Sequence, residues 1–229
     1  MPLALITGAS KGLGRALAHG LAERGWSLVL DARGAPALEA VARELPGGVT
    51  AIAGDVTDPS HRSALSDAVR GHGRLDLLVN NASYLGPSPM PALADFPLAE
   101  LARVYEVDVL APLALLQHVL PLLAVDAAVL NISSDAAVEA YAGWGGYGSA
   151  KAALDQLTAV LAVELPGRSV YAVDPGDMRT EMHQAAFPGE DISDRVEPSA
   201  VVPALLRLLD QRPASGRYRA SEFAIEAVR

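Results

Sequence analysis

Cysteine is absent from the 229-residue sequence, so disulfides, thiolate metal sites and cysteine nucleophiles are all excluded. Positive charge is scarce as well, because 18 Lys and Arg stand against 27 Asp and Glu and leave a formal net charge of −9. A surface of that sign repels the phosphate backbone, so we expect no nucleic-acid partner. The five histidines show no ligand spacing with nearby carboxylates, and we predict no metal site.

Long hydrophobic runs without interruption are also absent. The most apolar region, residues 109–132, contains Pro112, Pro121 and Asp126. These residues favour a buried helix followed by a buried strand over a membrane span. The chain begins with an apolar, strand-like stretch rather than with the basic segment and long apolar region of a signal peptide. We therefore expect a soluble, cytoplasmic protein without a membrane partner.

Apolar residues, in contrast, are abundant and make up 51% of the chain. At this length such a composition supports one large core, so we expect residues 1–229 to form a single domain. Short apolar runs predict strands at residues 4–7, 27–30, 49–53, 75–80, 128–133 and 170–174, and residues 215–219 are a candidate last strand. Longer patterns between them predict helices at about residues 12–24, 36–45, 59–70, 98–123 and 147–165.

This alternation of strands and helices is typical of an α/β fold. Several strands are apolar nearly throughout, as in a parallel sheet that is covered on both faces. We therefore predict a single-domain, Rossmann-type, doubly wound parallel sheet of about seven strands, with ligands at the carboxyl ends of the strands. Residues 83–97 and 181–198 are expected to be irregular and to lie over that edge, either as substrate-shaping loops or as simple surface connections.

The first predicted strand runs into a turn of sequence TGASKGLG, residues 7–14, and then into a helical pattern. Glycines permit a tight turn and let the backbone approach a pyrophosphate, which the N–H groups at the helix N-terminus then bind. The spacing differs from Gly-x-Gly-x-x-Gly, since Leu17 occupies the third glycine position. A strand–helix turn without a ligand is the alternative.

Tyr147 and Lys151 are four residues apart in a predicted helix and therefore lie on one helical face. A phenol with an ordinary pKa of about 10 is poorly matched to proton transfer at neutral pH. A lysine charge one turn away favours the phenolate and lowers that pKa. Ser134, at the end of a predicted strand, offers a hydroxyl to a substrate oxygen, whereas its neighbour Ser133 points to the opposite face. An ordinary surface pair is the alternative interpretation of the tyrosine and lysine.

Together these features resemble the short-chain dehydrogenase/reductase family, from about residue 3 to residue 219. The family's Thr-Gly-x-x-x-Gly-x-Gly pattern matches residues 7–14 in full, and further family motifs follow in order: Asp55-Val56, Asn80-Asn81-Ala82, Ser134, Tyr147 with Lys151, Pro175-Gly176 and Thr180. The resemblance implies an oxidoreductase that transfers a hydride between NADP(H) and a small-molecule carbonyl or alcohol, such as a ketone or aldehyde. It implies Tyr147 as general acid/base, Ser134 as hydrogen-bond donor to the carbonyl, and Lys151 as pKa modulator and ribose ligand.

The resemblance also implies which residues contact the cofactor: Gly8, Ser10, Lys11, Gly12, Leu13, Gly14, Arg33, Asp55, Val56, Asn81, Ala82, Tyr147, Lys151, Pro175, Gly176, Met178 and Thr180. After the second strand, Ala32 falls where NAD enzymes carry an acid, and Arg33 follows where NADP enzymes carry a base. Lys11 is a second base. Asp31 would become the ribose ligand if the alignment moved by one residue. Two cations against one displaced acid favour NADP(H), with NAD(H) as the alternative.

Two positions depart from the family pattern. Ser83 replaces the glycine that usually completes Asn-Asn-Ala-Gly, and Asp108 replaces an asparagine that helps to hold a relay water in many relatives. If that asparagine acts through a backbone carbonyl, Asp108 can substitute for it, whereas a role of the amide would leave the relay altered. A nucleotide-sensing regulator without turnover is therefore an alternative. A sugar-nucleotide epimerase or dehydratase is a weaker one, because those relatives carry a larger C-terminal region.

The resemblance finally implies an oligomer. Family members usually dimerise through the long helices after the fourth and fifth strands, which correspond here to residues 98–123 and 147–165. Both segments are rich in apolar residues, so we expect a homodimer. A homotetramer is the alternative, and the shortened C-terminal tail argues against it.

Overall fold

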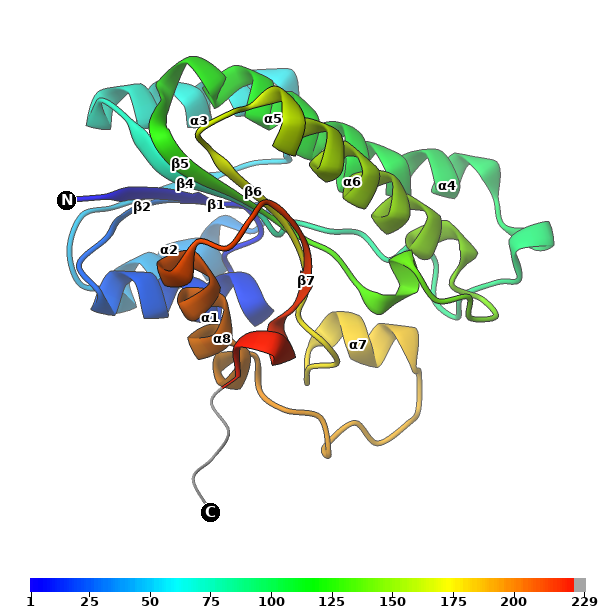
Figure 1. Ribbon diagram of the computed structural model, residues 1–229. Coiled ribbons are helices and arrows are strands. Elements are labelled where there is room, and N and C mark those ends of the chain that lie inside the picture. The colour runs from blue at the N-terminus through cyan, green and yellow to red at the C-terminus, as the bar shows by residue number, and fades with distance from the viewer. Residues whose placement is uncertain (225–229) are drawn as a thin grey trace.

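Seven strands of the computed structural model form one parallel sheet in the order β3-β2-β1-β4-β5-β6-β7 (Figure 1). They are β1 (Leu3–Ile6), β2 (Ser27–Ala32), β3 (Val49–Ala53), β4 (Leu75–Asn80), β5 (Leu123–Ile132), β6 (Ser169–Asp174) and β7 (Gly216–Arg219). From β1 the chain adds β2 and β3 on one side of the sheet and then β4 to β7 on the other, so the strand order reverses between β1 and β4. In open sheets, ligands bind at such a point, beyond the carboxyl ends of the strands. The predicted Rossmann-type parallel sheet is confirmed.

Helices cover both faces of this sheet (Figure 1). One face carries α3 (Pro59–His72), α4 (Leu98–Tyr105), α5 (Ala111–Val119) and α6 (Gly145–Glu164), and the other carries α1 (Gly12–Glu23), α2 (Ala35–Glu44) and α8 (Pro198–Gln211). Side chains alternate between the faces along a strand, so Ala4 and Ile6 pack with α1 and α8, whereas Leu3 and Leu5 pack with α3 and α5. The strands are buried on both sides, which explains their nearly continuous apolar sequence.

The helix predicted over residues 98–123 is interrupted. A π-helical turn, Glu106–Leu110, separates α4 from α5, and a 3-10 turn, Leu120–Leu122, ends the segment. Pro112 has no N–H to donate to the carbonyl four residues earlier, so a regular α-helical hydrogen-bond pattern cannot continue through this point. The Ala111 N–H bonds instead to the Glu106 carbonyl, five residues back. The strand predicted from residue 128 also begins earlier, at residue 123.

The segment expected to be irregular at residues 181–198 holds a short helix, α7 (Glu181–Ala186), beyond the carboxyl edge of the sheet (Figure 1). Thr180 begins this helix, because its hydroxyl accepts a hydrogen bond from the His183 N–H at 3.1 Å. The remaining short elements are the 3-10 turns Leu93–Asp95, Asp135–Ala137 and Ala220–Phe223. The helix α7 therefore forms one border of the ligand edge.

The structure describes residues 1–224, so residues 225–229 of the predicted domain lie outside the described residues. Within residues 1–224, the strands belong to a single sheet around which the helices pack. In that part of the chain, no helix combines the length and the apolar character that a membrane span requires.

Candidate active site

A cleft of about 990 Å³ runs along the carboxyl ends of the strands, between the glycine turn after β1 and the helix α7. The predicted site residues that line it are Gly8, Ser10, Lys11, Gly12, Leu13, Arg33, Asp55, Val56, Asn81, Ala82, Ser134, Tyr147, Lys151, Pro175, Gly176, Met178 and Thr180. The fold thus gathers segments from both halves of the chain around one cavity. Of the predicted site residues, Gly14 is the one that does not line it.

The turn between β1 and α1 depends on glycine at two points. Gly8 and Gly12 have φ angles of +66° and +55°, a left-handed conformation that glycine adopts without steric strain. A Cβ atom on Gly8 would also lie 2.9 Å from the Cα of Ala82. No side chain caps the N-terminus of α1, and its first turn holds no acidic residue. Its N–H groups are therefore available to an anion.

Gly14 lies behind the cleft, where α1 packs against the end of β1. A Cβ atom at this position would come within 2.5 Å of both the Gly8 carbonyl oxygen and the Asn81 side-chain amide. That amide donates to the carbonyls of Thr7 and Gly8 at 2.9 and 3.2 Å. Gly14 therefore serves close packing in the structure, and Asn81 holds the turn together.

The carboxylate at the end of β2 is engaged within the protein. Asp31 is 1% exposed, and one of its oxygens is 2.6 Å from Nε2 of His61 in α3. Burial holds the pKa of the Asp31 carboxyl above its ordinary value, although the hydrogen bond with His61 opposes this effect. Arg33, two residues later, is exposed and lines the cleft. Arg33 therefore offers a cation to the cleft, and Asp31, the acidic residue nearest to it in sequence, is already bonded to His61.

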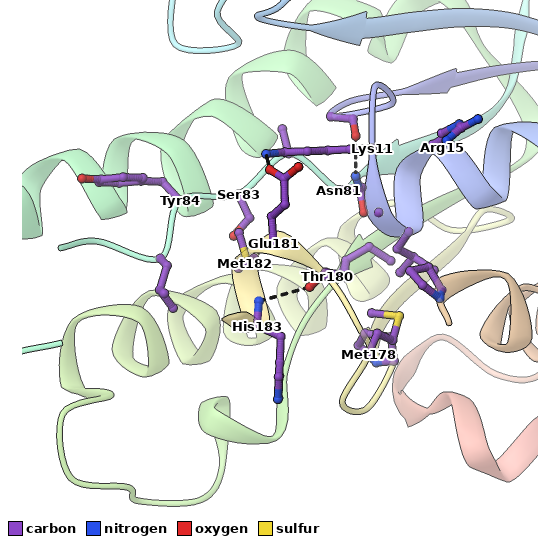
Figure 2. A pocket seen from close by; sticks show the side chains of 18 of the residues that line it. Lys11, Arg15, Asn81, Ser83, Tyr84, Met178, Thr180, Glu181, Met182 and His183 are labelled. Atoms are coloured by element: carbon purple, nitrogen blue, oxygen red, sulfur yellow. Dashed lines mark hydrogen bonds and ion pairs between the residues drawn. The ribbon is translucent and has the colours of Figure 1, made fainter. Parts of the chain in front are cut away.

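Lys11 links the glycine turn to α7. Its Nζ forms an ion pair with Glu181, the first residue of that helix (Figure 2). Both side chains are mostly exposed, so solvent screens the pair and it contributes little to stability. Lys11 can therefore exchange Glu181 for another anion that enters the cleft.

Tyr147 and Lys151 both lie on α6 and line the cleft. Both are buried, and the Lys151 Nζ is 5.4 Å from the centre of the Tyr147 ring. Lys151 donates to the Ile132 carbonyl at 3.0 Å and lies 3.0 Å from the carboxylate of Asp108. The alternative of an ordinary surface pair is therefore wrong for these two residues.

The pKa of Tyr147 lies above its ordinary value, which differs from the lowering expected from the sequence. Burial is the largest cause, because it disfavours the charged phenolate. The Lys151 charge acts in the expected direction and lowers the pKa of Tyr147, whereas the Asp108 carboxylate raises it. Burial also disfavours the charged form of Lys151, but Asp108 and Tyr147 together outweigh it and raise the pKa of the lysine. Lys151 is therefore paired with Asp108 while it lies 5.4 Å from the centre of the Tyr147 ring.

Ser134 follows β5 and begins a 3-10 turn. Its hydroxyl donates to Asp135 at 2.9 Å and accepts from the Ala136 N–H at 3.2 Å. This turn lies closely against α6, since a Cβ atom on Gly148 would be 2.5 Å from the Ala136 carbonyl oxygen. Gly148 directly follows Tyr147, so its missing side chain brings the Ser134 and Tyr147 segments together.

Comparison with known proteins places these features in one family. The family model described as short chain dehydrogenase matches residues 2–191. The chain is 35% identical over 182 residues to serine 3-dehydrogenase of Rhizobium radiobacter, which covers 77% of this chain and 72% of that protein. The chain belongs to the short-chain dehydrogenase/reductase family.

Another relative of this short-chain dehydrogenase is named for a different substrate. The chain is 33% identical over 219 residues to benzil reductase ((S)-benzoin forming) of Saccharomyces cerevisiae, which covers 90% of this chain and 81% of that protein. Among solved structures, a short-chain dehydrogenase of Shigella flexneri complexed with NADP matches with a TM-score of 0.88 and 27% identity, over 96% of this chain and 97% of that one. As a member of this family, the chain is an oxidoreductase.

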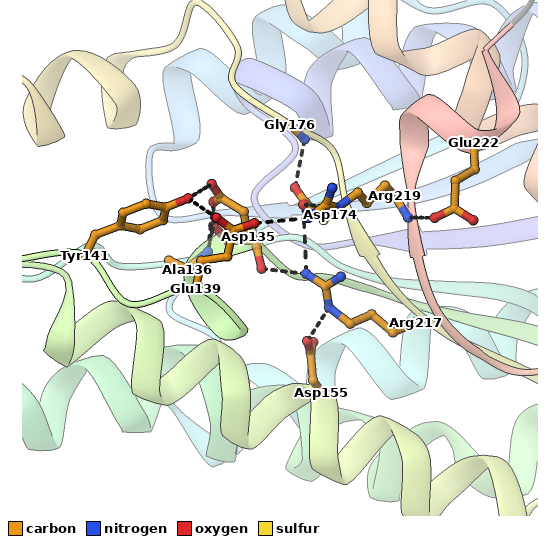
Figure 3. A network of polar contacts seen from close by, with 11 residues as sticks. Asp135, Ala136, Glu139, Tyr141, Asp155, Asp174, Gly176, Arg217, Arg219 and Glu222 are labelled. Carbon is orange, nitrogen blue, oxygen red and sulfur yellow. Dashed lines mark hydrogen bonds and ion pairs between the residues drawn. The ribbon is translucent and has the colours of Figure 1, made fainter.

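Sequence reasoning missed a polar network around Arg217 and Arg219 of β7, which contacts the dehydrogenase's α6 and the loop after β5 (Figure 3). Arg217 of β7 donates to the Ser134 carbonyl at 2.9 Å and to the Asp155 carboxylate on α6 at 2.8 Å. Arg219 contacts Glu139, in the loop after the Ser134 turn, at 3.1 Å. Because the Arg217–Ser134 contact joins residues 83 positions apart, no local pattern could have indicated it.

Sequence reasoning also missed that the dehydrogenase's two departures from the family pattern touch each other. The Ser83 hydroxyl donates to Asp108, and Asp108 pairs with Lys151. The sequence held one indication, because both departures occur at positions that the family pattern assigns to the same site. Their separation of 25 residues, across a loop and an irregular helix, gave no indication of contact.

Proposed function

We propose that this dehydrogenase transfers a hydride between NADP(H) and a small-molecule carbonyl or alcohol substrate. The observation that carries the proposal is the buried pair of Tyr147 and Lys151, which shares one cleft with Ser134 and with the uncapped N-terminus of α1. When bound, the cofactor supplies or accepts the hydride. The binding and proton-transfer steps fall to the side chains of this chain.

The cleft fits a dinucleotide that carries an additional phosphate. The left-handed Gly8 and Gly12 and the open N-terminus of α1 form a cradle for a pyrophosphate. Arg33 is exposed for a 2′-phosphate, whereas the Asp31 carboxylate, which would repel that group, is bonded to His61. The NADP complex of the Shigella flexneri relative supports the same cofactor here.

The remaining cleft residues complete the proposed cofactor site. Their backbone and side-chain groups lie at the ends of β3, β4 and β6 and at the start of α7. We assign the adenine to Asp55 and Val56, the adjacent ribose region to Asn81 and Ala82, and the nicotinamide to Pro175, Gly176, Met178 and Thr180.

In carbonyl reduction, Tyr147 donates its phenolic proton to the oxygen that would otherwise become an alkoxide. The Ser134 hydroxyl turns from Asp135 to that oxygen and donates a hydrogen bond to it. Lys151 stabilises the phenolate that remains, since its ammonium lies 5.4 Å from the ring centre. In alcohol oxidation the same groups work in reverse, and the Tyr147 phenolate accepts the hydroxyl proton.

Tyr147→Phe is expected to lower turnover by about a thousandfold, because proton transfer is lost, while NADPH binds nearly as before. Turnover is measured by NADPH oxidation with a panel of ketones, aldehydes and quinones that includes benzil, and by NADP⁺ reduction with L-serine. Calorimetry measures NADPH affinity. Tyr105→Phe, in α4 and outside the cleft lining, serves as the matched control.

Retained turnover in Tyr147→Phe would refute the role of the tyrosine. If the unaltered protein binds NADPH but turns over no member of the panel, the nucleotide-sensing alternative replaces the enzymatic one.

We further propose that the dehydrogenase acts as a homodimer in the cytoplasm, where nicotinamide dinucleotides are available. Exposed apolar side chains in the π-helical turn before α5 and on α6 support the dimer. Leu110, Val160 and Val163 are 51%, 42% and 82% exposed. Exposed apolar patches are typical of interaction surfaces.

A further inference from the structure

Asp108 lies in the π-helical turn between α4 and α5 and is 0% exposed. One of its carboxylate oxygens is 3.0 Å from the Lys151 Nζ and also accepts a hydrogen bond from the Ser83 hydroxyl. The other oxygen accepts from the Tyr84 N–H at 3.1 Å. Ser83 and Tyr84 belong to the loop after β4 at the wall of the cleft (Figure 2). Groups from two other segments therefore hold this carboxylate, and one of them is the ammonium beside Tyr147.

This contact joins the two positions at which the chain departs from the family pattern. Ser83 occupies a position where a glycine is usual, and a glycine has no side-chain hydroxyl to donate. Asp108 occupies a position where an asparagine is usual, and an amide carries no charge to pair with an ammonium. The two departures together therefore introduce a buried ion pair with its own hydrogen-bond donor.

The Lys151 ammonium has one contact to the π turn and one to the end of the sheet. It lies 3.0 Å from the Asp108 carboxylate and donates to the Ile132 carbonyl at the end of β5 at 3.0 Å. The lysine is 2% exposed, and a buried ammonium without an anionic partner is strongly destabilising. Asp108 supplies the partner.

We propose that Asp108 and Ser83 act as one unit that positions the Lys151 ammonium and balances its charge beside Tyr147. The inference rests on the proposed function and adds two positioning residues, which hold Lys151 and also act on Tyr147 itself. Because the carboxylate offsets part of the lysine charge, the phenol keeps its proton up to a higher pH than it would with an uncharged residue at position 108. The pH range in which the protein can donate a proton to a carbonyl substrate during its reduction is thereby extended upward.

Other ionisable groups face the pair, but each acts on it differently. Asp135, in the loop after β5, raises the pKa of Tyr147 and is itself bonded to Tyr141 within that loop. Asp155, on α6, raises the pKa of Lys151 and is paired with Arg217. Asp108 acts on both Tyr147 and Lys151, so its charge is the one that couples them.

Asp108→Asn tests the proposal without a substrate. The ultraviolet absorbance of phenolate is recorded against pH with and without an added Tyr147→Phe substitution, so that the difference reports Tyr147. Asp108→Asn is expected to lower the pH of phenolate formation by about one unit, because a nearby negative charge is removed. Glu106→Gln removes an exposed carboxylate from the same π turn and is expected to leave the titration unchanged. An unchanged or raised titration in Asp108→Asn overturns the proposal.

A second measurement uses benzil reduction by NADPH. Ser83→Gly combined with Asp108→Asn restores the residues usual in the family and leaves an amide oxygen that can accept a hydrogen bond from Lys151. The double variant is therefore expected to lose less kcat than Asp108→Ala, with a pH profile displaced to lower pH. Asp108→Ala leaves a buried ammonium unpaired and is expected to lower kcat at least about tenfold, with little change in KM for benzil. Equal losses in both variants would count against the proposal. If the unaltered protein turns over no substrate, the proposed function fails, and the phenolate titration still decides the role of Asp108.

Discussion

Single residues are expected to decide whether the cleft favours NADPH or NADH. Arg33 presents a guanidinium at the end of β2, and such a group can bind a phosphate through two parallel hydrogen bonds. Lys11 is a point charge that pairs with Glu181 in a solvent-screened contact. The Asp31 carboxylate is buried against His61. We therefore expect Arg33 to carry most of the discrimination between NADPH and NADH.

Arg33→Ala is expected to raise the KM for NADPH at least about tenfold, because a charge-assisted hydrogen bond contributes about 1.5–3 kcal/mol. The KM for NADH is expected to change less than about twofold, since NADH has no 2′-phosphate. Initial rates with each cofactor measure both values. Arg24→Ala, which removes an arginine paired with Asp210, is the control. Equal increases for the two cofactors would contradict the assignment of Arg33.

At the scale of elements, the site depends on how closely α6 lies against the loop after β5. Gly148 permits this approach, because a Cβ atom there would meet the Ala136 carbonyl oxygen at 2.5 Å. Gly71 in α3 offers a comparison, since a Cβ atom on it would meet nothing within 4 Å. The same substitution at these two helical glycines is therefore expected to have opposite effects.

Gly148→Ala is expected to lower the free energy of unfolding by about 1–3 kcal/mol, because backbone must shift to accommodate the methyl group. It is also expected to reduce kcat, since the Ser134 turn moves relative to Tyr147. Gly71→Ala is expected to raise the free energy of unfolding by about 0.5–1 kcal/mol, because alanine has the higher helix propensity. Urea unfolding followed by circular dichroism measures both, and the same sign at both positions would refute the packing argument.

At the scale of the whole molecule, a net charge of −9 coexists with a cleft lined by Lys11, Arg33 and Lys151. The overall charge disfavours bulk polyanions, whereas local cations and a helix N-terminus attract a small anionic cofactor. The exposed apolar side chains of α6 lie away from these cleft residues. The cleft cations are therefore available for cofactor binding, and the exposed apolar side chains of α6 are available for the proposed self-association.

Val160→Glu combined with Val163→Glu is expected to convert the proposed homodimer to a monomer, because each added charge would be buried at the interface. Sedimentation velocity at micromolar concentration measures the change in mass. Val196→Glu places the same charge on an exposed valine of the loop before α8 and is expected to leave the oligomeric state unaltered. A monomeric unaltered protein would refute the dimer outright.

Most of the element order could be predicted, because apolar periodicity and turn residues act over a few positions. The π-helical turn could not be placed, since Pro112 is compatible with a helix start and its missing hydrogen bond shows only in the context of a longer helix. The short helix α7 could not be predicted either. Its N-cap is Thr180, a residue that the family resemblance assigns to the cofactor.

Residue types at short spacings made the cofactor turn, Ser134, Tyr147 and Lys151 candidates. Their roles came from the resemblance to the short-chain dehydrogenase/reductase family. The charge balance of the site followed from neither. Asp108 contacts Lys151 from a position 43 residues earlier in the chain, and both side chains are buried. Burial and the neighbouring Asp108 carboxylate then raise the pKa of Tyr147. Only the tertiary structure decided this shift, because desolvation and contacts between distant residues exist only once the chain has folded.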